Sequence, residues 1–199
     1  MNYFAHLVLA QPTVASKVGN LMGDFMRGVR EEQLPPAVRQ GLLNHRLVDR
    51  VTDEHPLVIE SRRLFSPERR RFAGVALDVV FDHFLVRHWD RIYATPLSAE
   101  IHRDYRWLRE GAILMPAPMR LITRRMAQHD WFSQYGDLGN IGLALDRIAA
   151  RIRFANRFTG IIEEVDQHYA ELEEVFLTLY PVLQQAVAEH ALEIIPSAE

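Results

Sequence analysis

The sequence predicts an all-α protein in which a single compact helical domain spans residues 1–199. Apolar residues recur at helical spacing along most of the chain, and no segment alternates for long as a half-buried strand would. Prolines fall between these helical segments, where they can begin or end helices. A chain of 199 residues can bury a sizeable core as one domain but is short for two.

Proline and glycine positions predict most helix boundaries. The apolar start of the chain forms the first predicted helix, and the second ends at Gly28. Prolines open or directly precede the third to the seventh helices, and Pro181 separates the last two. Three glycines within 135–142 predict a loop or helix junction beside the eighth helix. The predicted helices are 2–10, 15–28, 36–53, 56–65, 68–93, 97–114, 119–128, 138–153, 161–178 and 181–192.

Composition excludes several classes of protein and site. The chain has no cysteine, so disulfides, thiolate metal sites and a cysteine nucleophile are excluded, and a metal would need His, Asp, Glu or Asn ligands. A net charge of -3 gives no general attraction to nucleic acid. We expect no secretory signal and no membrane span, because the apolar start lacks basic residues and no apolar stretch is long enough. The cytoplasm is the simplest compartment for such a chain.

Four of the first five predicted helices carry a polar pair at i, i+4 among apolar neighbours. Residues four apart lie one above the other on a helix, so each pair can face a common site. The four pairs are Asn2/His6, Asn20/Asp24, His45/Asp49 and Asp78/Asp82.

The pair Asp78/Asp82 gives the strongest single signal. It lies in GVALDVVFDHFL, which is apolar nearly all round, as a buried helix is. A buried, unpaired carboxylate costs several kcal/mol, and two on one face also repel each other. A divalent metal removes both problems, and the alternative is pairing with the arginines at 69–71.

The other three pairs are weaker on their own. His45/Asp49 shares its stripe with the small residue Gly41, which leaves room for a ligand, but such a pair is also common as a surface hydrogen bond. The alternative for His6 is a satisfied core histidine, and for Asp24 it is a helix cap. Together the pairs predict a carboxylate-rich site for Mn²⁺ or Mg²⁺. Arg27 is a candidate phosphate clamp or else a solvated arginine.

Four motifs of this chain resemble, in order and spacing, those of bacterial acyl carrier protein phosphodiesterases. They are MNYFAHLVLA, GNLMGDFMRG, GLLNHRLVDRVTDEHP and LDVVFDHFLVRHW. The resemblance covers essentially the full length. It implies a helical fold like that of HD phosphohydrolases and Mn²⁺-dependent hydrolysis of the phosphodiester joining 4'-phosphopantetheine to a serine of holo-acyl carrier protein. It implies Asp24 first, with His6, as catalytic residues, and Arg27 joins them as the candidate phosphate clamp. The metal ligands it implies are Asp24, His45, Asp49, Asp78, Asp82 and His83.

One departure concerns Asp82 and His83. HD enzymes have His followed by Asp, whereas this chain has the reverse order. Adjacent residues point about 100° apart around a helix, so the two side chains cannot both reach one metal comfortably. We therefore expect His83 either behind the ligands or facing an apolar pocket.

The resemblance also implies acyl carrier protein, which is small and acidic, as the protein partner. Two arginine clusters could dock it, or each could be a solvated helix face. A set of bulky residues could line a slot for the substrate, although core packing is their more common role. Rival functions are an HD-type nucleotide phosphohydrolase and a non-catalytic helical binding protein. The clusters are Arg62, Arg63, Arg69, Arg70, Arg71 and Arg120, Arg124, Arg125; the slot residues are Trp107, Met115, Met119, Met126 and Trp131.

Overall fold

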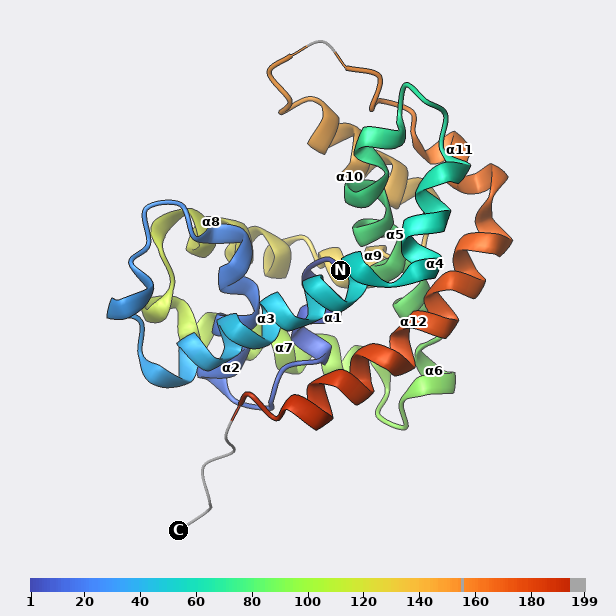
Figure 1. Ribbon diagram of the computed structural model, residues 1–199. Helices are drawn as coiled ribbons and strands as arrows, with labels where there is room; N and C mark the ends of the chain where they lie inside the picture. Colours follow the sequence, from blue (N-terminus) through green and yellow to red (C-terminus); the bar gives the residue numbers. More distant parts are fainter. Residues whose placement is uncertain (155, 194–199) are drawn as a thin grey trace.

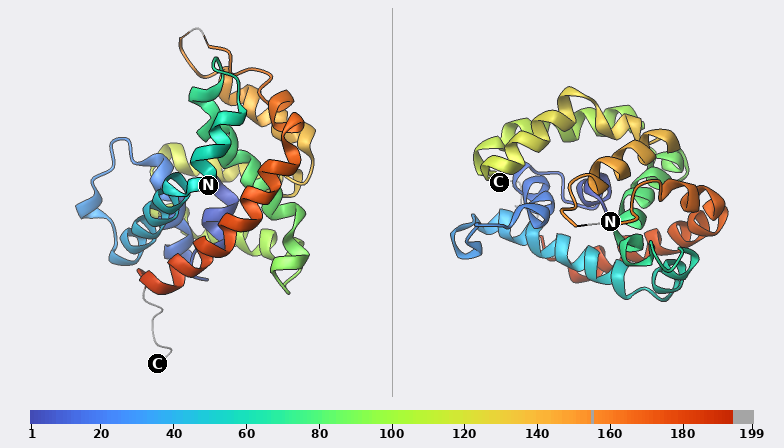
Figure 2. Two further views of the ribbon diagram at one scale, coloured as in Figure 1. Left: turned by 45° about the vertical axis from the view of Figure 1, so that its right-hand side comes forward. Right: turned by 90° about the horizontal axis from the view of Figure 1, so that it is seen from above.

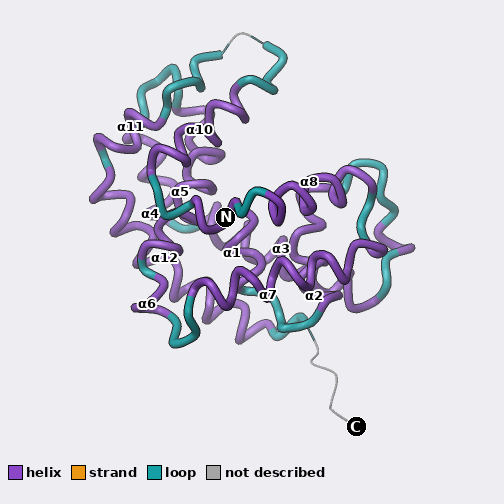
Figure 3. The backbone as a smooth tube through the Cα atoms, turned by 180° about the vertical axis from the view of Figure 1, so that it is seen from behind, coloured by secondary structure: helices purple, strands orange, loops and turns teal. Residues whose placement is uncertain are grey.

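Helices make up every regular element in the described residues, which are 1–154 and 156–193 of this computed structural model. The all-α prediction is therefore confirmed, and Figure 3 shows helices joined by loops. Residues 194–199 of the predicted 1–199 domain lie outside the described part. The α-helices are α1 (Tyr3–Val8), α2 (Val14–Met22), α3 (Pro36–Glu54), α4 (Pro56–Ser61), α5 (Ala73–Arg87), α6 (Trp89–Ile92), α7 (Leu97–Glu110), α8 (Ala117–Gln128), α9 (Trp131–Gln134), α10 (Leu138–Ala149), α11 (Ile162–Gln167) and α12 (Tyr169–His190). Single turns of 3₁₀-helix are η1 (Gly23–Phe25), η2 (Glu31–Gln33), η3 (Arg62–Leu64), η4 (Arg70–Phe72) and η5 (Gly111–Leu114).

The short helix α1 lies at the centre of the molecule (Figures 1 and 2). It contacts α2 on one side and α5 on the other, and Phe4, Ala5 and Leu7 are fully buried. The helices α2, α3, α7 and α8 lie together, whereas α4, α5, α10 and α11 form the opposite part. The long helix α12 joins the two parts, because it packs on α3, α4 and α5. None of the described helices combines the length and apolarity needed to cross a bilayer.

Both ends of α1 are held by charged side chains from other helices. At its first turn, Asp82 of α5 accepts hydrogen bonds from the backbone N–H groups of Phe4 (2.8 Å) and Ala5 (3.0 Å). At its last turn, the Nζ of Lys17 donates to the carbonyl oxygen of Leu7 at 2.7 Å. An anion at the first turn and a cation at the last are the signs that the helix dipole favours.

Lys17 is the one lysine in the sequence and is almost completely buried. Its Nζ lies 2.9 Å from the Oδ1 of Asp104 on α7 and 4.9 Å from the centre of the Trp107 ring. A buried cation needs such partners, because an unpaired buried charge is strongly unfavourable. The same side chain thus ties α1, α2 and α7 together.

The helices α2 and α3 cross unusually closely at two glycines. A Cβ added to Gly19 would lie 2.2 Å from the carbonyl oxygen of Val38, and one added to Gly41 would lie 2.8 Å from that of Ser16. Any larger residue would force the two backbones apart. The close crossing brings the end of α2 next to the middle of α3.

Several predicted boundaries are corrected by the structure. The predicted helix 68–93 is divided, since α5 ends at Arg87 and His88 leaves the helical conformation before α6. The predicted helix 161–178 is also divided at His168, and helix 15–28 ends in η1 at Phe25. The predicted start of helix 138–153 is confirmed, since α10 begins at Leu138, where the Asp137 side chain accepts the N–H of Asn140 as a helix cap, but α10 ends at Ala149.

Pro181 does not separate two helices, as predicted, but lies inside α12. Proline lacks the N–H that would bond to Leu177, a loss that normally disfavours a helix interior. Phe176, Leu179, Tyr180 and Leu183 around it are all buried in the core. Packing of this face therefore outweighs the missing hydrogen bond.

The capping role of Asp82 leads to a stability prediction. The Asp82→Ala substitution should lower the free energy of unfolding by roughly 2–4 kcal/mol, because it leaves two backbone N–H groups buried without acceptors. Urea titration followed by circular dichroism measures this loss. The matched control Glu174→Ala, which removes an exposed carboxylate of α12, should change stability little. An Asp82→Ala variant as stable as that control would show that the cap is unimportant.

Candidate metal centre

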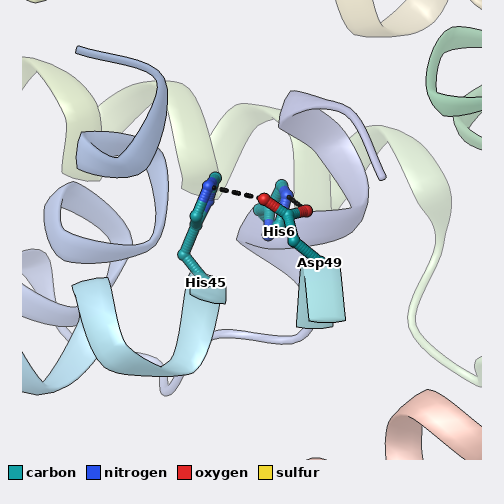
Figure 4. Close-up of side chains that lie close together, drawn as sticks. All are labelled: His6, His45 and Asp49. Carbon is teal, nitrogen blue, oxygen red and sulfur yellow. Dashed lines mark ion pairs between the residues drawn. The ribbon is translucent and has the colours of Figure 1, made fainter. Parts of the chain in front are cut away.

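The imidazole of His6 on α1 meets the imidazole of His45 and the carboxylate of Asp49 on α3 (Figure 4). The Nε2 of His6 lies 3.1 Å from the Oδ1 of Asp49, and the Nε2 of His45 lies 3.0 Å from its Oδ2. The two imidazole rings stack with their centres 3.9 Å apart. One ligand atom of each residue lies within 4.8 Å of the others, which is close enough to hold one metal ion. We call these three residues the His6–His45–Asp49 cluster.

The orientation of His45 is set from α2. Its Nδ1 donates to the backbone carbonyl oxygen of Asn20 at 2.7 Å, so the neutral ring has its lone pair on Nε2, facing Asp49. Donation of the second ring N–H to a backbone carbonyl is the arrangement that usually accompanies metal-binding histidines. Gly23 leaves room for the ring, since a Cβ there would lie 2.1 Å from the His45 Nε2.

Asn20 is itself held by polar contacts that reach to the end of the described chain. Its amide nitrogen donates to the Oε1 of Glu193 at 2.9 Å, and its Oδ1 accepts a hydrogen bond from Asn44 at 2.9 Å. The same Glu193 oxygen accepts from the hydroxyl of Ser16 at 2.6 Å. These contacts hold the end of α2, and through it the carbonyl to which His45 donates.

His6 is the least satisfied member of the cluster. Its side chain is fully buried, and within the described part of the chain neither ring nitrogen makes a well-aligned hydrogen bond. The Nε2 of His6 is therefore close to the Oδ1 of Asp49, but the angles between them are not those of a hydrogen bond. Burial lowers the pKa of His6 to about 3, so the ring is neutral and keeps a lone pair. A neutral, buried imidazole without a donor or acceptor partner fits a metal ligand.

The N-terminal ammonium group contacts both Asp49 of the cluster and the neighbouring carboxylate of Asp78. The N-terminal ammonium of Met1 lies 2.8 Å from the Oδ1 of Asp78 and 3.6 Å from the Oδ1 of Asp49. Burial would raise the pKa of Asp49, but the two histidines and this ammonium outweigh it and hold that pKa well below its usual range. The neighbourhood of Asp49 and Asp78 is therefore one that favours positive charge.

Asp24 lies at the edge of the cluster, in η1, directly after Gly23. Its side chain is exposed, yet neighbouring protein partly removes water from the carboxyl and raises its pKa, while the charge of His45 opposes that shift. Arg27 follows in the exposed segment after η1. Both residues are thus on the solvent side, where a substrate can approach.

Asp82 and His83 are used for other contacts, so we do not retain them as ligands. Both carboxylate oxygens of Asp82 accept the backbone N–H groups of α1, and burial raises the pKa of this residue to about 7. The Nδ1 of His83 donates to the carbonyl oxygen of Tyr135 at 2.7 Å, and its Nε2 accepts from the Tyr169 hydroxyl at 2.9 Å. The expectation that His83 stands outside direct coordination agrees with this position.

Two contributors were not found from the sequence. The ammonium of Met1 belongs to the backbone and leaves no mark in a residue pattern. Glu193 bonds to Asn20 across 173 positions, and nothing near it in the sequence indicates that contact. The sequence pairs Asn20 with Asp24, and its contact with His45, like that of Gly23, follows only from the crossing of α2 and α3.

Comparison with known proteins points to one family. A family model described as acyl carrier protein phosphodiesterase matches residues 1–183. A protein of that name from Photorhabdus laumondii is 37% identical over 186 residues, covering 93% of this chain and 94% of its own. Relatives of the same name from Yersinia pestis and Salmonella newport are 35% and 36% identical over 195 residues, which is 96% of this chain and 98% and 100% of theirs. No solved structure matches the chain, so the relation to HD phosphohydrolases stays a prediction.

The contact between Gly23 and His45 leads to a prediction for metal affinity. The Gly23→Ala substitution should weaken Mn²⁺ binding by about 10- to 100-fold, because the new methyl group displaces the His45 ring. Isothermal titration calorimetry with Mn²⁺ measures the change.

The matched control is Gly74→Ala, in the first turns of α5, where an added Cβ meets no atom closer than 3.9 Å. That control should bind Mn²⁺ as the unaltered protein does. Equal affinity of the Gly23→Ala and Gly74→Ala variants would contradict the role given to the His45 ring.

Proposed function

The chain belongs to the acyl carrier protein phosphodiesterase family, and we propose that it hydrolyses holo-acyl carrier protein at a divalent metal held by the His6–His45–Asp49 cluster. In this reaction water adds to the phosphorus that joins 4'-phosphopantetheine to a carrier serine. The bond to the serine oxygen breaks, and that oxygen takes a proton. The products are apo-carrier and free 4'-phosphopantetheine, so atoms and charge balance.

One observation carries the metal part of this proposal. Among residues 1–154 and 156–193, His6 has no aligned hydrogen-bond partner, and its buried, neutral ring lies next to a second imidazole and a carboxylate. Two nitrogen ligands with carboxylates suit Mn²⁺, with Mg²⁺ as the alternative. Such an ion supplies Lewis acidity toward a phosphoryl oxygen and lowers the pKa of a bound water. His6, which was predicted to be catalytic, is thus proposed as a ligand.

Asp24 remains the residue we propose as most directly catalytic. It is exposed beside the cluster, where it can accept a proton from the attacking water or complete the ligand set. Asp78 is proposed to hold positive charge next to Asp49, as it does with the ammonium of Met1. Arg27 is proposed to bind a phosphate oxygen, since its exposed position after η1 is close in sequence to Asp24.

For docking of the acidic carrier we favour the second arginine cluster. Three members of the first cluster are engaged elsewhere: Arg62 pairs with Asp53, Arg63 with Glu60, and Arg69 with Glu164. In contrast, Arg120 and Arg124 line a groove of roughly 770 Å³ between α7 and α8, together with Arg109. A row of guanidinium groups along an open groove complements an acidic partner. Of the predicted slot residues, Met115, Met119 and Met126 are buried in the core, whereas Trp107 and Trp131 are only partly buried.

The direct test is incubation with holo-acyl carrier protein and Mn²⁺, with mass spectrometry of the carrier. We expect loss of the 4'-phosphopantetheine group, its prevention by a chelator and its recovery when Mn²⁺ is restored. The Asp24→Ala and Asp49→Asn variants should lose at least about 100-fold in turnover. The control His102→Ala removes an exposed imidazole of α7 and should keep full activity.

Two outcomes would overturn this proposal. One is near-full turnover by Asp24→Ala or Asp49→Asn. The other is hydrolysis of nucleotides, but not of holo-carrier, by the Mn²⁺-loaded protein, which would favour the rival nucleotide phosphohydrolase.

A further inference from the structure

A second groove, of roughly 170 Å³, begins at the first residues of α1. One wall is made by α8 and α9, and the other by one face of α10. Val79 of α5 contributes to its lining. The lining residues are Asn2, Tyr3, Val79, Ile122, Trp131, Gln134, Tyr135, Asn140, Ala144, Arg147, Ile148 and Arg151. We call this the α10 groove.

The lining of the α10 groove combines apolar and hydrogen-bonding groups. Ile122, Ala144 and Ile148 offer partly buried aliphatic surface, and Trp131 adds a partly exposed ring. Three amide side chains contribute as well, on Asn2, Gln134 and Asn140. Apolar walls with a few amides suit a flexible chain that is itself mostly aliphatic but interrupted by amide groups.

The α10 groove adjoins the metal centre through α1 and α5. Asn2 follows Met1, whose ammonium lies among the carboxylates, and Val79 follows Asp78. The ring of Tyr3 stacks on Phe25, the residue after Asp24, with centres 6.2 Å apart and planes 17° from parallel. Tyr3 therefore lines the groove and also contacts the residue that follows Asp24.

We propose that the α10 groove binds the pantetheine arm of the substrate while its phosphodiester lies at the metal centre. This inference rests on the proposed function. The arm is a neutral chain of methylene, methyl, hydroxyl and amide groups that leaves the phosphorus on the side opposite the carrier serine. The apolar surface would cover its aliphatic parts, and Asn2, Gln134 and Asn140 would bond to its amides.

The charges on and after α10 fit the same occupant. Arg147 lies on α10 and Arg151 lies two residues after its end, and both line the groove, so positive charge is offered to the phosphate at the start of the arm. Burial is the main cause that raises the pKa of the Tyr3 phenol to about 12. The charge of Asp24 adds to this rise, and the charge of Arg151 opposes it. Tyr3 thus contributes a neutral phenol to the groove lining.

The test fills the groove without touching the metal centre. Ala144→Phe places a ring in its wall, whereas the control Leu143→Phe changes the neighbouring residue of α10, which is 55% exposed and does not line the groove. Titration calorimetry of Mn²⁺-loaded protein with 4'-phosphopantetheine and with inorganic phosphate distinguishes binding of the pantetheine arm from binding of the phosphate group. We expect Ala144→Phe to weaken 4'-phosphopantetheine binding by about tenfold or more, which equals about 1.4 kcal/mol. Phosphate and Mn²⁺ binding should not change.

Kinetics with holo-carrier give the second readout. Ala144→Phe should raise KM by a similar factor, and Leu143→Phe should not. If Ala144→Phe does not fold, Trp131→Ala, which removes the aromatic part of the wall, takes its place with the same expectation.

The inference is overturned if both groove variants bind 4'-phosphopantetheine as the unaltered protein does. It is also overturned if they impair only carriers bearing an acyl chain, because the groove would then hold that chain. Failure of the unaltered protein to release 4'-phosphopantetheine from holo-carrier would instead refute the proposed function, and the binding data identify which of the two has failed.

Discussion

Charged side chains that bind both ends of α1 determine its position in the fold. A helix of six residues is too short to persist in water by itself, so its stability must come from other parts of the fold. Asp82 accepts its first N–H groups, and Lys17 binds its last carbonyl, each with the sign that the helix dipole favours. Because His6 lies between these two anchors, they determine where its ring stands relative to α3.

The second constraint is the close crossing of α2 and α3 at Gly19 and Gly41, which brings the carbonyl of Asn20 to the Nδ1 of His45. The two imidazole rings and the Asp49 carboxylate are thereby held close together. Such a cluster is unfavourable unless a cation or a proton joins it. The nearby ammonium of Met1 meets part of this need at Asp49 and Asp78. The packing of α1, α2 and α3 therefore creates a site that favours a bound cation.

The fold class and most helices were predictable, because helical periodicity is a local property of the sequence. The i, i+4 pairs also identified His6, His45 and Asp49 correctly as side chains that meet. The spacing could not show that Asp78 and Asp82 have different roles. Asp82 binds backbone N–H groups 77 and 78 positions away, and such distant contacts are not visible in a local pattern. Pro181 was misjudged since burial of α12 outweighs a local preference. Contacts of the N-terminal ammonium and of Glu193 depend on tertiary structure alone.

We propose above all that His6, His45 and Asp49 coordinate one divalent ion. Anomalous diffraction at the manganese edge from crystals grown with Mn²⁺ tests this coordination most directly. We expect a peak within bonding distance of the Nε2 atoms of His6 and His45 and of the Asp49 carboxylate. A peak coordinated by Asp82 and His83, or fully loaded crystals with no peak at the His6–His45–Asp49 cluster, would contradict it.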